Sequence, residues 1–326
     1  MRLDPRRLAA RRPPLLGAVA LLGGVLALSS ACGGGESGSD GWDAATLGRV
    51  SQAQPFTASL INAQVGAGPA RLGFGLFDRD GGLVHDAAGA LRLVTLEGDK
   101  PTEAGRFDLT RVALEETETH THDGKTETHT DPVATVYVAN VDLARGEWWG
   151  AELAVRTADK EHTLRTRFFV QEKTSEPAIG AAVPRSTQRV LRDVRDIAEI
   201  DSSNPPRPAL HELTVAEAIA SGKPSLVAFA TPAFCRTRFC GPVVDSVVAP
   251  LAERYAGRVL FLHIEPYDLA QARQGRLVAI PELEQWGLTT EPYLFLVDGS
   301  GKVAAKFEGI TSAEEVEAAL RRLLGN

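Results

Sequence analysis

Residues 225–242 read SLVAFATPAFCRTRFCGP, an apolar run followed by two cysteines and a Gly-Pro pair. The apolar run, 225–230, has the length and composition of a buried strand. Pro242 favours a first helical turn just after the second cysteine. Cys235 and Cys240 are therefore expected where a strand leads into a helix. The N-terminus of a helix stabilises a thiolate there, and a neighbouring thiol can close a disulfide.

The residues around this stretch alternate between helical and strand patterns. Amphipathic or capped segments predict helices over 214–220, 243–255 and 313–324. Thr214 is the expected N-cap of the first, Pro250 is expected to kink the second, and Thr311 or Ser312 caps the third. Apolar runs predict further strands over 259–264, 293–297 and 302–307.

This order of elements resembles the thioredoxin family over residues 209–326. The residues that carry the resemblance are the cysteine pair, Gly222-Lys223-Pro224 before the first strand, Trp286 to Pro292, and Gly309. The resemblance implies an α/β thioredoxin fold and thiol-disulfide oxidoreductase activity without a required cofactor. It also implies that Pro292 is the family's cis-proline and that Glu291 and Pro292 face the cysteines and bind substrate.

The cysteine spacing departs from the family, which has two residues between its cysteines where this chain has four. Residues five apart on a regular helix diverge by about 140°. We therefore expect Cys235 in a loop and Cys240 near the helix start. Two assignments stay open: Cys235 attacks because it follows the strand directly, or Cys240 attacks because Phe239-Cys240-Gly241-Pro242 matches the family's aromatic-Cys-Gly-Pro.

Two further features bear on this chemistry. The family often carries a buried acid at the position of Ala228, whereas Arg236 and Arg238 between the cysteines favour a thiolate. The alternative interpretation is a disulfide that only staples a turn, which stabilises a fold by about 2–3 kcal/mol.

The N-terminus predicts export. Residues 1–31 contain a basic region with Arg6, Arg7, Arg11 and Arg12 and then an apolar stretch over 15–28, which is too short for a confident membrane span. Together with Cys32 they resemble a bacterial lipoprotein signal, in which the cysteine is lipidated; an ordinary signal peptide cut near Ala31 is the alternative. Residues 32–50 form a flexible tether. Both alternatives place the protein outside the cytoplasm, and lipidation would anchor it to the cell membrane.

The remaining chain predicts two domains. Short strand patterns over 51–172, such as 133–138 and 147–155, are similar to those of an all-β immunoglobulin-like sandwich. Residues 173–208 read as a Pro-rich connector with a short helical stretch over 187–197. The fold class expected is thus a sandwich followed by a thioredoxin-like domain over 209–326.

A histidine-rich segment over 118–129 forms a second candidate site. Asp123-Gly124 predicts a two-residue hairpin turn. Strand alternation then places on one face the imidazoles and carboxylates of Glu118, His120, His122, Glu127 and His129. Such a set could bind Zn²⁺ or Cu²⁺, and a solvated hairpin tip is the alternative. The remaining histidines, His85, His162, His211 and His263, are isolated and are expected to be structural.

Composition excludes one class of partner. The net charge is −7 and no long basic block follows the signal, so nucleic acid is not expected. The expected partners are protein thiols or disulfides of the cell envelope and, through the lipid, the membrane. The alternative function is a non-catalytic binding or metal-handling lipoprotein in which the cysteine pair is structural. Copper chaperones with a thioredoxin fold fit less well, because no histidine follows His263.

Overall fold

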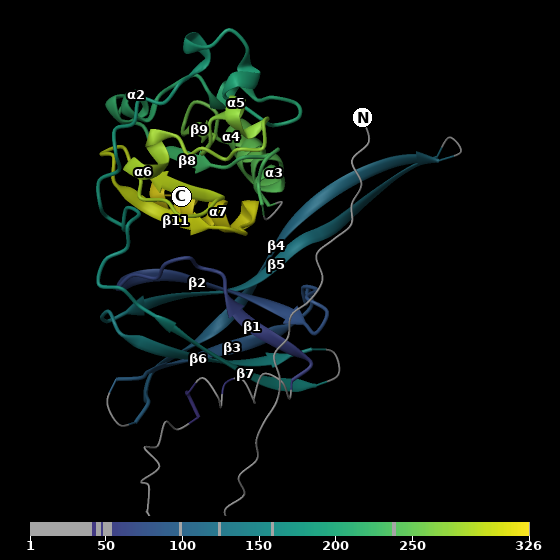
Figure 1. The fold of residues 1–326 in the computed structure, drawn as a ribbon, viewed down its shortest axis with the longest axis vertical. Coiled ribbons are helices and arrows are strands. Elements are labelled where there is room, and N and C mark those ends of the chain that lie inside the picture. Colours follow the sequence, from purple (N-terminus) through teal and green to yellow (C-terminus); the bar gives the residue numbers. More distant parts are fainter. Residues whose placement is uncertain are drawn as a thin grey trace, which may run out of the picture. The chain divides into compact units, whose positions relative to one another are not determined.

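A computed structural model (Figure 1) describes residues 41–43, 47, 54–97, 100–122, 125–157, 160–236 and 239–325. For the strand residues between 116 and 131 only the backbone is described. The expected signal segment, Cys32 and most of the expected tether lie outside these residues, as does Arg238. Among the helices within the described ranges, none is long and apolar enough to cross a membrane.

The first seven strands are antiparallel and form one sheet. They are β1 (Phe56–Leu60), β2 (Gly68–Asp78), β3 (Ala88–Thr95), β4 (Thr102–His122), β5 (Lys125–Leu143), β6 (Trp148–Arg156) and β7 (Glu161–Phe169). Their order is β1-β2-β5-β4-β3-β6-β7, and the outer strands β1 and β7 also contact each other. The sheet is therefore nearly closed, and one core cluster draws buried side chains from all seven strands.

Strand alternation explains this core. In β6, Trp149, Ala151, Leu153 and Val155 are buried, while Trp148 is exposed. The expected strands over 133–138 and 147–155 lie within β5 and β6. The long strand β4 pairs with both β3 and β5, with a register shift after Leu114. The observed seven-stranded sheet is continuous, and the immunoglobulin-like sandwich stays a prediction.

The histidine-rich segment lies at the far ends of β4 and β5. Its backbone register pairs Glu118 with His129, His120 with Glu127 and His122 with Lys125, which confirms the predicted hairpin pairing. The side chains of these residues and the turn at 123–124 lie outside what the structure describes. Metal binding at this hairpin therefore stays a prediction.

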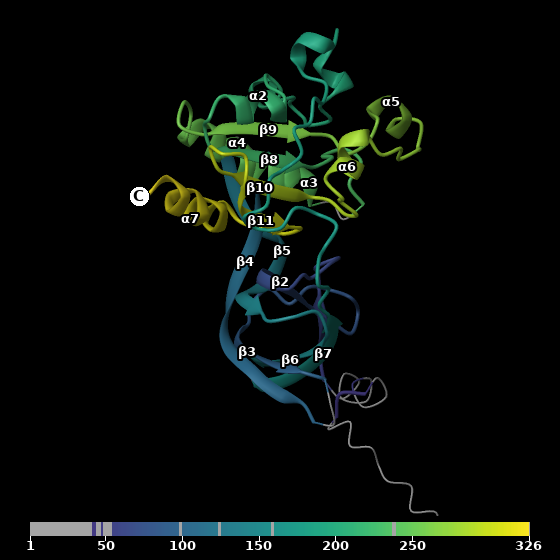
Figure 2. The ribbon, with the colours of Figure 1, turned by 90° about the vertical axis from the view of Figure 1, so that its left-hand side faces the viewer.

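A second sheet of four strands follows, made of β8 (Ser225–Phe229), β9 (Leu260–Ile264), β10 (Tyr293–Val297) and β11 (Val303–Glu308). Figure 2 shows them in the order β11-β10-β8-β9. The pair β8 and β9 is parallel, and the other two pairs are antiparallel. The strands predicted over 225–230, 259–264, 293–297 and 302–307 are all present.

Helices cover both faces of this sheet. They are α2 (Val215–Ala220), α3 (Cys240–Val243), the π-helical η4 (Val244–Val248), α4 (Ala249–Arg254), α5 (Leu269–Ala272), α6 (Pro281–Gln285) and α7 (Ala313–Leu324). Alternate residues of β8 point to opposite faces of the sheet. Leu226 packs in one core cluster with α3, η4, α4 and α7, and Val227 packs in another with α2 and α6.

The helix ends follow the sequence signals. Thr214 caps α2 in a capping box with Glu217, and Ser312 caps α7. The stretch from α3 to α4 runs through the π-helical η4 just before Pro250. Proline has no N–H to donate to the carbonyl four residues earlier, so the hydrogen-bond ladder is perturbed at the expected place.

The segment 173–208 packs against the second sheet rather than spanning open solvent. Gly180 N donates to Val303 O at 2.7 Å, and Val183 N donates to Gly301 O at 3.0 Å. Ser186, Gln188 and Val190 are buried. The helical stretch expected over 187–197 is wrong, because the structure has only the single 3₁₀ turns η1 (Leu191–Asp193) and η2 (Ile197–Glu199) there; η3 (Pro208–Leu210) follows.

A shielded ion pair joins β2 to the start of α7. Arg71 donates to Glu315 through Nε at 2.6 Å and Nη2 at 2.9 Å, and Nη2 also donates to Ile310 O at 2.8 Å. The side chains are 8% and 18% exposed, so little solvent screens the pair.

Replacing Arg71→Met is expected to lower the free energy of unfolding by about 3 kcal/mol, because it leaves Glu315 shielded without its partner. Chemical denaturation measures the change. Arg106→Met is the control, because Arg106 is 69% exposed in its pair with Glu103 and should contribute less than about 1 kcal/mol. Equal effects of the two substitutions would contradict the prediction.

Candidate active site

The two cysteines lie in and just after the loop between β8 and α3. The strand β8 ends at Phe229, Cys235 lies in the loop, and Cys240 is the first residue of α3. This confirms the predicted placement of one cysteine in a loop and the other at a helix start. The loop is fastened by Phe234 N, which donates to Thr231 O at 3.2 Å, and by Ala233 N, which donates to Ser202 Oγ at 3.0 Å.

The loop brings the two thiols together. Cys235 is half-buried and Cys240 is fully buried. A hydrogen bond with Cys235, then burial and the charge of Cys235, raise the pKa of the Cys240 thiol well above its ordinary value. Cys240 is therefore protonated at neutral pH, and Cys235 is the more accessible sulfur.

The predicted substrate-binding pair, Glu291 and Pro292, lies just before β10. The peptide bond between them is cis, as the resemblance implies. Burial raises the pKa of Glu291, the charge of Cys235 raises it further, and Arg236 opposes the shift. The structure thus brings Cys235, Arg236 and Glu291 within electrostatic reach of one another.

Tyr267 is a site residue that the sequence did not reveal. Its hydroxyl donates to Glu291 Oε2 at 2.9 Å. Burial and this hydrogen bond raise the pKa of Tyr267 above its ordinary value, so the phenol remains a neutral donor. The residue follows β9 as an isolated tyrosine, and no spacing links it to Glu291 in the sequence.

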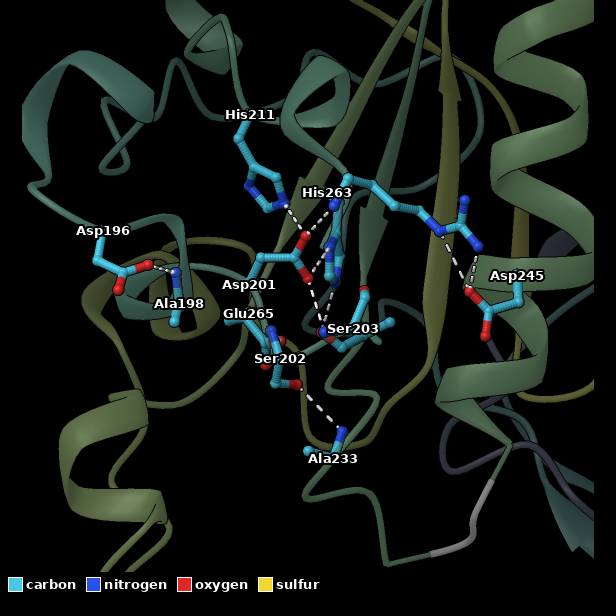
Figure 3. A network of polar contacts seen from close by, with 12 residues as sticks. Asp196, Ala198, Asp201, Ser202, Ser203, His211, Ala233, Asp245, His263 and Glu265 are labelled. Atoms are coloured by element: carbon cyan, nitrogen blue, oxygen red, sulfur yellow. Dashed lines mark hydrogen bonds and ion pairs between the residues drawn. The ribbon is translucent and has the colours of Figure 1, made fainter. Parts of the chain in front are cut away.

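A buried polar cluster lies next to Ser202, which holds Ala233 of the cysteine loop (Figure 3). Asp201, His211 and His263 are each 2% exposed. His211 Nε2 lies 3.3 Å from Asp201 Oδ2, and His263 Nδ1 lies 3.7 Å from Asp201 Oδ1. We call these three residues the Asp201 cluster. The two histidines looked isolated in the sequence, and the structure brings them together.

The cluster is tied to both the sheet and the loop. His263 is the register partner of Ala228. Its Nε2 lies 2.9 Å from the carbonyl oxygen of Ala230. Ser202, next to Asp201, holds the loop residue Ala233. His263 therefore lies beside Ala228 in the sheet, and Asp201 of segment 173–208 lies beside that histidine.

Comparison with solved structures gives a likeness to a thioredoxin-family protein. No protein-family model matches the chain, and no curated protein matches it significantly. A solved thiol:disulfide interchange protein of the thioredoxin family from Chlorobium tepidum TLS is a structural neighbour. The match covers 39% of this chain and 92% of that one, with 19% sequence identity and a TM-score of 0.26. Such a TM-score is too low to support an argument about activity.

Iodoacetamide at neutral pH is expected to modify Cys235 before Cys240 in the folded, reduced protein. The thiolate is the reactive form, and Cys240 is both buried and held as a thiol by its raised pKa. Peptide mapping by mass spectrometry over time measures the two rates. Protein unfolded in guanidinium is the control and should lose the difference. Faster labelling of Cys240 in the folded protein would show that the order is wrong.

Glu291→Gln is expected to speed alkylation of Cys235 at a given pH. The carboxylate and the Cys235 thiolate repel each other, and glutamine removes the charge while keeping an oxygen to accept from Tyr267. The rate is measured between pH 6 and 9 at about 0.01 M salt, where the Debye length is about 30 Å and the two charges are screened little. Glu284→Gln, at an exposed position of α6, is the matched control. An unchanged or slower rate in the Glu291 variant would count against the interaction.

Proposed function

We propose that this protein is an extracytoplasmic, lipid-anchored thiol-disulfide oxidoreductase that uses Cys235 as nucleophile and Cys240 as resolving thiol. The observation that carries the proposal is the hydrogen bond between the two cysteine side chains across four intervening residues. Cys235 is half-buried and Cys240 is buried. This difference in exposure suits a pair in which one thiol attacks the substrate disulfide and the other then resolves the mixed disulfide.

The reaction proceeds by two exchanges. The Cys235 thiolate attacks one sulfur of a protein disulfide, the substrate S–S bond breaks, and the departing thiolate takes up a proton. Cys240 then loses its proton and attacks the Cys235 sulfur of the mixed disulfide. The second substrate thiol leaves, and a Cys235–Cys240 disulfide remains. Two electrons pass from the protein to the substrate, and the reverse sequence oxidises a dithiol.

The groups around Cys235 define the substrate side. The positive charge of Arg236 favours the Cys235 thiolate, whereas the negative charge of Glu291 disfavours it. In the proposed complex, Glu291 and Pro292 contact the substrate peptide beside the attacked disulfide. Since both thiol and disulfide partners are proteins of the cell envelope, no diffusible cofactor is needed for the exchange.

The proposed location rests on the sequence. The arginine-rich start, the apolar stretch over 15–28 and Cys32 together support export and lipidation. An extracytoplasmic compartment is one in which disulfides persist, so a protein thiol-disulfide exchanger has substrates there.

Two cysteine variants test the activity. Cys235→Ser is expected to abolish reduction of a model protein disulfide, because the attacking sulfur is gone. Cys240→Ser is expected to accumulate a mixed disulfide on Cys235, because the intermediate cannot be resolved. Turnover with a thiol reductant and mass spectrometry of the trapped adduct measure these effects. Cys32→Ser is the matched control and should retain full activity.

The alternative is a disulfide that serves only as a staple. A Cys235→Ser protein with wild-type turnover, together with loss of stability in both cysteine variants, would establish that alternative and rule out the enzyme. The chain would then be a binding lipoprotein.

A further inference from the structure

We propose that the Asp201 cluster is a binding site for a divalent transition-metal ion, with Zn²⁺ as the best-fitting occupant. The ligands would be His211 Nε2, His263 Nδ1 and a carboxylate oxygen of Asp201. All three donor atoms lie within 4.8 Å of one another. This site is separate from the cysteines and from the histidine-rich hairpin, and it does not depend on the redox activity proposed above.

The distances between donors suit a bound ion. Zinc bonds to imidazole nitrogen and carboxylate oxygen are about 2.0–2.2 Å, so adjacent donors in a tetrahedral site are about 3.3 Å apart. The distance from His211 Nε2 to Asp201 Oδ2 is 3.3 Å, and that from His263 Nδ1 to Asp201 Oδ1 is 3.7 Å. The two imidazoles lie beside different oxygens of Asp201, so the carboxylate would bind through both oxygens or rotate to offer one of them to the ion.

The outer hydrogen bonds orient the proposed ligands. The carbonyl of Ala230 can only accept, so His263 Nε2 carries the proton and donates at 2.9 Å, which leaves the Nδ1 lone pair directed at Asp201. The Asp201 oxygens accept from Ser203 N at 2.8 Å and from Arg207 N at 2.7 Å. Metal ligands are oriented by outer contacts of this kind.

The inner atoms lack hydrogen bonds. His211 Nε2 and His263 Nδ1 are buried, and neither has a hydrogen-bond partner among the described residues. Buried polar atoms rarely lack a hydrogen bond, and a bound ion is one reason why such an atom can lack one. A cation between the two nitrogens and the carboxylate would satisfy all three groups at once. Protons on the rings are the competing explanation, and the experiment below separates the two.

An adjoining cavity leaves room for a further ligand. A cavity of about 430 Å³ is lined by His211, His263, Glu265 and Tyr267, among others. Glu265 Oε2 is buried there with no hydrogen-bond partner in the described part of the chain. Three protein ligands with one open position are typical of zinc sites that bind water or an exogenous ligand. Two imidazoles and one carboxylate favour Zn²⁺ or Cu²⁺ over Ca²⁺ and Mg²⁺, which prefer oxygen ligands.

Binding can be isolated from the other metal-ligating groups of the chain. The background protein is the full chain with His120, His122 and His129 replaced by alanine and Cys32, Cys235 and Cys240 replaced by serine. After removal of metal with a chelator, Zn²⁺ is titrated against a competing chromophoric chelator. We expect one equivalent of Zn²⁺ to bind. We expect each of three ligand substitutions to weaken binding more than about 100-fold: His211→Gln, His263→Gln and Asp201→Asn. Substituting a residue that only hydrogen-bonds to a metal ligand typically costs about 10- to 100-fold.

Two controls keep the test decisive. His162→Gln, at a half-buried histidine outside the cluster, should bind Zn²⁺ like the background. Zn²⁺ should also raise the unfolding midpoint of the background and leave that of His211→Gln unchanged, because an ion that binds only the folded state stabilises it. If a ligand variant does not fold, Co²⁺ bound to the background should show tetrahedral d–d bands. A background that binds no Zn²⁺ at micromolar concentrations, binding unaffected by the ligand substitutions, or no tetrahedral Co²⁺ spectrum would overturn the proposal.

Discussion

The carboxylate of Asp201 is the constraint on which the arrangement around the cysteines depends. A charge buried to this extent must be compensated by donors or cations. Burial alone would raise the pKa of Asp201, but the adjacent His211 and His263 and the backbone N–H of Arg207 outweigh it and hold the pKa below its usual range. Satisfying this one group fixes the course of residues 201–211 against β9. The same stretch holds the cysteine loop through Ser202 and Ala233.

The parts of the fold that the sequence predicted are those with local signals. The run at 225–230 is apolar at every position, and β8 is buried on both faces. Thr214 and Ser312 precede helices for the usual capping reason, since their oxygens accept from backbone N–H groups two or three residues later. The backbone pairing of the histidine-rich hairpin followed from a two-residue turn and strand alternation. Each of these inferences needs only a few neighbouring residues.

Features built from distant residues could not be predicted in this way. Asp201 lies in an irregular segment, His211 directly follows the 3₁₀ turn η3, and His263 lies in β9. No spacing in the sequence links these three residues. The prolines of 173–208 suggested a spacer, although Ser186, Gln188 and Val190 are buried at alternate positions. That alternation was a signal of packing, but two of its three residues are polar. Closure of the seven-stranded sheet likewise depends on the contact between its first and last strands.

The wide cysteine spacing is compatible with exchange chemistry because the additional residues lie in the loop and not in the helix. Had both cysteines been helical, their side chains would point apart by about 140°. Cys240 is instead the first residue of α3, and the side chain of Cys235 contacts the Cys240 sulfur from the loop. The hydrogen bond and charge of Cys235 that raise the pKa of Cys240 both disappear once Cys235 forms a mixed disulfide. In the proposed mechanism, loss of these two contributions would lower the pKa of Cys240, which burial still raises, at the step that requires its thiolate.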